Sequence, residues 1–176
     1  MDLSVIIDIS LNVLIIGVAI VGAVTDVAKK KIYNWLTYPA LLAGLLLQAI
    51  GHGWGGVFGL GLVSSILGAG FCTVVFGAFC VWGKGFGAGD VKLMAALGAM
   101  AGFVHSMTVA MATALIGAVM ALLRIAFGKN GIVAIKRLFK RDKEEKREPI
   151  TVPYGIAIAL GAIWATLIRF NILKIF

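Results

Sequence analysis

The sequence predicts an all-α membrane protein with six transmembrane helices, and three observations predict it. Hydrophobic residues make up 61% of the 176 residues and charged residues only 14%, with a mean hydropathy of +1.03. A soluble domain carries about 25% charged residues, so lipid must be part of the solvent of this chain. The apolar residues fall into separate runs, and the basic residues gather between alternate runs.

The apolar runs are read as spans because a helix crosses a hydrocarbon core about 30 Å thick with about 20 residues. The run at 36–50 is short unless it tilts or uses flanking aromatic residues such as Trp35 and Trp54. The run at 91–104 is also short and contains glycine. Small residues at four-residue spacing, as in Gly98/Gly102, Gly155/Ala159 and Gly161/Ala165, predict close contacts between helices. The six predicted spans are 4–24, 36–50, 57–82, 91–104, 106–127 and 150–170.

The loop charges predict the orientation of these spans. Lysines lie between spans one and two and around the start of span four, and a basic loop at about 128–149 lies between spans five and six. The alternate connections, at 51–56 and near His105, contain no Lys or Arg. The positive-inside rule then puts the charged loops in the cytoplasm and both termini outside, in a multi-pass protein of the cytoplasmic membrane.

We expect residues 1–176 to form a single transmembrane domain. The basic loop suits either an amphipathic helix on the anionic lipid leaflet or a solvated loop with no specific role. Because the net charge of +8 is confined to such loops, membrane lipid is an expected partner and nucleic acid is not. The sequence does not indicate the oligomeric state.

The eight acidic residues are few enough to be taken one by one. Four lie in the basic loop, where solvated ion pairing explains them, and Asp2 and Asp8 lie at the outer end of span one. Asp26 closes span one and Asp90 opens span four on the same, cytoplasmic side. Asp90 alone would suit a helix N-terminus, but two carboxylates at one membrane depth favour a functional pair. Asp8, 18 residues before Asp26, is about 27 Å away along the helix axis.

A carboxylate pair can carry out aspartic protease chemistry. Like charges a few ångströms apart do not both ionise, so one acid keeps a proton while the other acts as a base toward water. We expect no metal and no cofactor. His52 and His105 fall at the outer face and are interpreted as interface residues, and Cys72 and Cys80 form no CxxC motif.

The glycine-rich segment that leads to Asp90, residues 83–90, is the second functional signal. Glycines let the backbone adopt positive φ and approach another chain closely, and such an edge can bind an extended peptide. A flexible hairpin and a phosphate-binding loop are the alternatives, but no GK[ST] follows and no strand precedes the segment.

These motifs resemble a known family. Gly87-Ala88-Gly89-Asp90 resembles the GxGD membrane aspartic proteases, and the continuation through Lys92 resembles the type IV prepilin peptidase form. Asp26 matches the first aspartate of that family and precedes a similar basic stretch and turn, with Tyr33 in place of the proline. Pro153 matches the start of the last core helix.

The resemblance implies that Asp26 and Asp90 are catalytic, with Gly87, Gly89, Lys92 and Pro153 in substrate binding or support. It implies an endopeptidase that removes a short basic leader from prepilin-like or preflagellin-like precursors at the cytoplasmic face. The insert with paired cysteines that accompanies N-methylation in larger members is absent, so no methyltransferase activity is expected.

Two other functions remain open on the sequence. A small transporter would use Asp26 and Asp90 to relay protons or bind a cation, but few polar residues lie mid-span. A presenilin-like protease also has GxGD, but it expects Pro-Ala-Leu where this chain has Pro153-Tyr154-Gly155.

Overall fold

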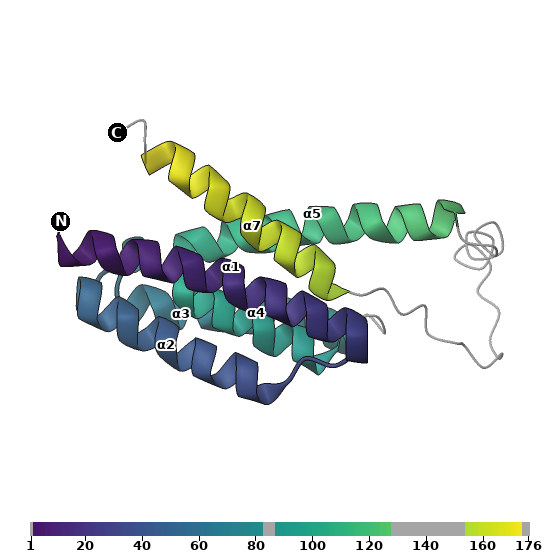
Figure 1. Ribbon diagram of the computed structural model, residues 1–176, viewed down its shortest axis with the longest axis horizontal. Coiled ribbons are helices and arrows are strands. Elements are labelled where there is room, and N and C mark those ends of the chain that lie inside the picture. The colour runs from purple at the N-terminus through teal and green to yellow at the C-terminus, as the bar shows by residue number, and fades with distance from the viewer. Residues whose placement is uncertain (1, 83–86, 128–153, 174–176) are drawn as a thin grey trace.

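The computed structural model describes residues 2–82, 87–127 and 154–173, and these residues form helices joined by turns without any strand. Successive helices run in opposite directions along one long axis, so the start of α1 and the end of α7 lie at the same end (Figure 1). The all-helical class predicted from the sequence is confirmed. The helices are α1 (Leu3–Lys29), α2 (Asn34–His52), α3 (Leu62–Trp82), α4 (Ala88–Ala101), α5 (Phe103–Phe127) and α7 (Tyr154–Leu173).

The outer surface of this bundle is apolar, as expected of a protein that faces lipid. Three helices among the described residues are long and apolar enough to cross a membrane, at Leu3–Lys29, Leu62–Val81 and Phe103–Leu123, and Tyr154–Arg169 is a shorter apolar helix. Their outward residues remain highly exposed, including Val13 at 62%, Val74 at 72% and Leu115 at 64%. The chain is therefore a membrane protein, while six spans with both termini outside stay a prediction.

Helix α4 lies at the centre of the bundle. It contacts α1, α2, α3, α5 and α7, and every residue from Leu93 to Ala101 is buried. A helix that is apolar all round is buried on all sides, which fits its run of alanine, leucine and methionine. Its 14 residues span about 21 Å, so Asp90 near its start is held at one end of the bundle interior.

Small residues bring the helices together, as the sequence predicted. A Cβ at Gly98 of α4 would lie 2.5 Å from the carbonyl oxygen of Gly68 in α3, and a Cβ at Gly161 of α7 would collide with Thr113 of α5. Gly102 makes the predicted close contact, since a Cβ at Gly68 of α3 would lie 3.0 Å from its carbonyl carbon, and it has a second role. Its φ of 79° ends α4, and the N–H of Phe103 then donates to Ser64 Oγ at 2.8 Å.

Several predicted boundaries were wrong. Helix α5 begins at Phe103 rather than Ser106, because the break at Gly102 comes earlier than expected, and α3 begins at Leu62 rather than Val57. Before Leu62 the chain turns through Gly53, Gly55 and Gly61, all with positive φ. Helix α1 continues to Lys29, so Asp26 lies inside its last turns. The basic loop at 128–149 and Pro153 lie outside the described residues.

Candidate active site

Asp26 lies near the carboxyl-terminal end of α1, where the chain reverses toward α2. Lys30 takes a left-handed conformation with φ of 50°, and its N–H donates to the carbonyl oxygen of Asp26 at 2.7 Å. The half-buried Asp26 side chain accepts a hydrogen bond at Oδ2 from the backbone N–H of Gly155, 2.9 Å away. The first N–H groups of a helix have no partner within it and favour a negative charge, so Asp26 caps the start of α7.

Asp90 occupies the first turn of α4. Its Oδ2 accepts a hydrogen bond from the N–H of Gly87 at 3.0 Å, so the interpretation of Asp90 as a helix-end residue describes part of its geometry. The residue is only 7% exposed, and its Oδ1 is buried without a hydrogen-bond partner among the described residues. Helix capping does not account for that second oxygen, because a buried polar atom without a partner costs free energy.

Helix α1 packs against α4, and the end of α1 and the start of α4, which carry Asp26 and Asp90, lie at the same end of the bundle (Figure 1). Glycines allow this close approach. A Cβ at Gly89 of α4 would lie 3.0 Å from Cβ of Ile32 in the α1–α2 turn, and a Cβ at Gly22 of α1 would lie 2.7 Å from Leu93 of α4. The two aspartates that the sequence singled out therefore lie on neighbouring helix ends, and their action as one pair stays a prediction.

Lys92 joins the start of α4 to the start of α2. Its Nζ donates to Asn34 Oδ1 at 2.9 Å and lies 5.5 Å from the centre of the Tyr38 ring, which is within range of a cation–π contact. Of the other predicted support residues, Gly87 precedes α4 and bonds Asp90, while Gly89 packs against Ile32. These contacts indicate that Lys92 supports the α1–α2 turn.

A family model described as the type IV leader peptidase family matches residues 13–122, which is more than half of the chain. The chain belongs to the type IV leader peptidase family. The matched segment includes both Asp26 and Asp90 and ends before Gly155. The resemblance to prepilin peptidases that the sequence motifs indicated is confirmed, and the chain is a protease. Comparisons with curated proteins and with solved structures gave no match.

The leader peptidase also has an apolar groove next to Asp26. A cavity of about 350 Å³ lies between the last turns of α1 and the first turn of α7, and it is lined by Ala23, Val24, Val27, Ala28 and Ile156. Asp26 stands in the same turns of α1, and Ile156 follows the glycine that bonds Asp26.

Sequence reasoning missed Gly155 as a site residue of this peptidase. It was assigned to helix packing, but its N–H holds Asp26, and a Cβ there would lie 2.7 Å from Cβ of Asp26. The signal in the sequence was the helix start after Pro153, because an acidic side chain suits free helix N–H groups. Nothing in the sequence indicated which acidic side chain that would be.

The described residues contain no group of three or more His, Cys, Asp or Glu side chains that could hold a metal ion. The expectation of a mechanism without a metal or cofactor stays a prediction.

Proposed function

We propose that this leader peptidase is an aspartic endopeptidase of the cytoplasmic membrane that removes short basic leaders from prepilin-like precursors. One observation carries the proposal. Asp26 near the end of α1 and Asp90 at the start of α4 each have one carboxylate oxygen held by a backbone amide, Gly155 N–H for Asp26 and Gly87 N–H for Asp90. Fixed side chains of this kind are what proton transfer in a transition state requires.

In the proposed reaction one carboxyl group of the pair is ionised and the other is protonated, because two like charges this close repel. The ionised group takes a proton from a water molecule, whose oxygen attacks the carbonyl carbon of the scissile peptide. The protonated group donates its proton to the carbonyl oxygen as that oxygen gains charge. Collapse of the tetrahedral intermediate breaks the C–N bond, and a proton passes to the leaving amine.

The apolar groove supplies a place for the part of the precursor that follows the cut. In the family that the motifs resemble, a hydrophobic helix follows the leader, and such a helix can lay its apolar face into an apolar groove. The groove runs along the last turns of α1, the turns that also contain Asp26. A precursor helix placed there would bring its preceding peptide bond to the carboxylate pair.

The decisive experiment replaces each aspartate by its uncharged isostere. Asp26→Asn and Asp90→Asn each should lower cleavage of a co-expressed prepilin at least a thousandfold, since either change removes a proton donor or acceptor from the reaction. The readout is the mobility shift of the precursor on a gel, with membrane level of the enzyme measured in parallel. Asp2→Asn is the matched control, because Asp2 is exposed at the other end of α1.

Normal processing by either variant at normal protein level would reject the pair as the catalytic groups. The wild-type rate should be unchanged by EDTA, and inhibition that added zinc reverses would favour a metal mechanism instead. The family match favours the peptidase over a transporter that uses Asp26 and Asp90. A transporter would also show an activity that depends on an ion gradient, which leader cleavage does not.

A further inference from the structure

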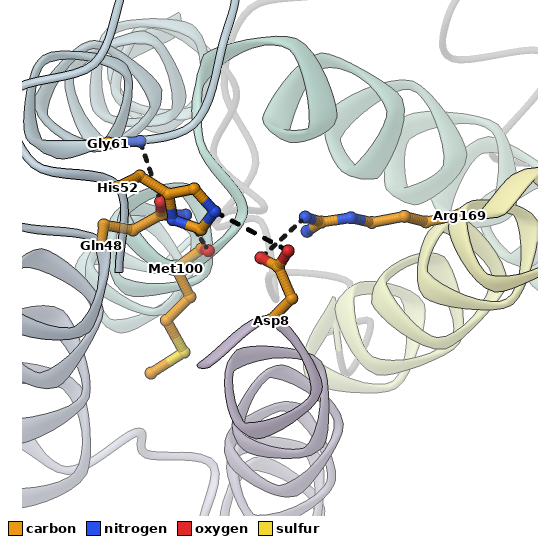
Figure 2. A network of polar contacts seen from close by, with 6 residues as sticks. All are labelled: Asp8, Gln48, His52, Gly61, Met100 and Arg169. Atoms are coloured by element: carbon orange, nitrogen blue, oxygen red, sulfur yellow. Dashed lines mark hydrogen bonds and ion pairs between the residues drawn. The ribbon is translucent and has the colours of Figure 1, made fainter. Parts of the chain in front are cut away.

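A second polar cluster (Figure 2) comes from the start of α1 and the ends of α2 and α7, which lie at the other end of the bundle from Asp26. Asp8 of α1 stands between His52 of α2 and Arg169 of α7, with its Oδ2 3.8 Å from His52 Nε2 and its Oδ1 3.4 Å from Arg169 Nη2. Beside it, Gln48 of α2 accepts a hydrogen bond from Gly61 N–H and donates one to the carbonyl oxygen of Met100, each 3.0 Å long. The proposed peptidase reaction uses none of these groups.

The contacts within this region leave some of its hydrogen-bonding atoms without a partner. Within the described part of the chain, Arg169 Nη1 and His105 Nε2 are buried and have no hydrogen-bond partner. A guanidinium has five N–H donors, and among residues 2–82, 87–127 and 154–173 the contact given for it is the one to Asp8 Oδ1, at 3.4 Å. Ionisable groups placed among membrane helices are costly unless they are paired, so the cationic side of this cluster requires a further acceptor.

A cavity of about 380 Å³ borders both unpartnered groups. Its walls come from the α2–α3 loop, the α4–α5 junction and the last turns of α7, and its volume falls in the range of small-molecule sites, about 300–1,000 Å³. The apolar residues of the lining are exposed, with Phe58 at 81%, Val104 at 48% and Ile168 at 37%. The cavity thus combines a partly buried cationic group, one nitrogen of which is fully buried, with an exposed apolar rim.

We propose that this cavity binds a phosphate ester, with Arg169 and His105 as the hydrogen-bond donors. The planar guanidinium matches the geometry of phosphate oxygens, and a neutral imidazole protonated at Nε2 supplies one more donor. A metal cation would be repelled by Arg169. The apolar rim makes a phospholipid headgroup the expected source, and free phosphate is the other source with the same chemistry. The site does not depend on the proposed catalytic mechanism.

The test measures lipid binding to the purified full-length protein in detergent by native mass spectrometry. We expect one phosphatidylglycerol molecule per chain, bound about tenfold more tightly than diacylglycerol with the same acyl chains, because only the first carries a phosphate. Inorganic phosphate is titrated in a second arm. Displacement of the lipid by phosphate would show that the phosphate group alone is recognised, and failure to displace it would show that recognition needs the acyl chains as well.

Two variants and a control separate this site from general charge effects. Arg169→Lys keeps a cation for Asp8 but loses the planar fork, and His105→Phe keeps the ring but loses the donor, so each should weaken lipid binding about tenfold. Lys31→Gln removes one charge from an exposed position at the opposite end and should leave binding unchanged. Equal binding of diacylglycerol, or full affinity in both cluster variants, would overturn the proposal, and thermal unfolding of each variant checks that it is folded.

Discussion

At the scale of single residues, Gly155 shows how the structure fixes the position of Asp26. The glycine gives the carboxylate a hydrogen bond of 2.9 Å, and its missing side chain leaves the room in which that carboxylate lies. A Cβ at this position would lie 2.7 Å from Cβ of Asp26 and 2.8 Å from its Oδ2. The start of α7 and the end of α1 can meet there only if the residue is glycine.

Gly155→Ala should therefore displace Asp26 and lower kcat for precursor cleavage by about tenfold to a hundredfold, since misplacing a catalytic group by about 1 Å has effects of that size. Gly117→Ala is the matched control, because a Cβ at Gly117 would meet α7 at an ordinary 3.8 Å. The measurement is cleavage rate against precursor concentration for both variants. A wild-type kcat in the Gly155→Ala variant would mean that the position of Asp26 does not depend on the missing side chain at residue 155.

The residues found from sequence and those missed differ in the kind of information they need. Asp26 and Asp90 stood out because an acidic residue is rare in an apolar chain and is costly in lipid. Gly155 and Arg169 could not be assigned, because their partners Asp26 and Asp8 lie 129 and 161 residues away along the chain. Spacing and periodicity report only on neighbours within a helix. His52 likewise appeared to be an isolated interface residue until the fold placed it beside Asp8.

At the scale of elements, the position of Asp90 depends on the close packing of α4 against α3. Gly98 and Gly68 approach each other so closely that a side chain at Gly98 would press on the backbone oxygen of Gly68 at 2.5 Å. Backbone cannot rotate away as a flexible side chain can. The α3–α4 pair must separate if this space is filled.

Gly98→Ala should lower the free energy of unfolding by about 1–3 kcal/mol, the usual cost of overpacking. Gly70→Ala, on the open side of α3 with nothing within 4 Å, should be neutral or stabilising by up to about 1 kcal/mol, because alanine favours a helix. Thermal unfolding in detergent measures both. Equal melting temperatures would show that α3 and α4 do not pack as closely as described.

The groove beside Asp26 gives a second test at this scale. Ala28→Trp fills space between α1 and α7 and should raise KM for the precursor at least about fivefold, with a smaller change in kcat, because it competes with an apolar segment for the same volume. Val13→Trp places the same side chain at a 62% exposed position of α1 away from the groove. If the two variants have the same KM, the precursor does not use the groove.

Helix existence was predictable from the sequence, and helix boundaries were less so. Long apolar runs identify α1, α3 and α5 because lipid imposes a minimum length. The breaks depend on backbone conformation instead. The positive φ at Gly102 ends α4, and the positive φ at Gly61 delays the start of α3. The chain has 23 glycines, and composition alone does not show which of them breaks a helix. The short α4 was predicted from the apolar run at 91–104, and it begins and ends three residues earlier, at Ala88 and Ala101.

At the scale of the whole molecule, the two polar clusters lie at opposite ends of one apolar bundle. Asp26 and Asp90 lie at the end where α1 stops and α7 begins, and Asp8, His52 and Arg169 lie at the other end (Figures 1 and 2). Between them the buried residues are almost all apolar or small. This separation gives the molecule two chemically different ends, so its orientation in the membrane decides on which side cleavage occurs.

The orientation predicted from the loop charges can be tested by thiol labelling in intact cells. In a Cys72→Ala, Cys80→Ala background that retains cleavage, a membrane-impermeant maleimide should label the Gly56→Cys variant directly, because that loop is exposed and carries no Lys or Arg. The Lys31→Cys variant, in the turn after Asp26, should react only after permeabilisation, since basic loops remain in the cytoplasm. The reverse pattern would put Asp26 and Asp90 outside and exclude cleavage at the cytoplasmic face. Labelling of both variants in intact cells would mean that no membrane separates the two ends of α2, and the six-span arrangement would be wrong.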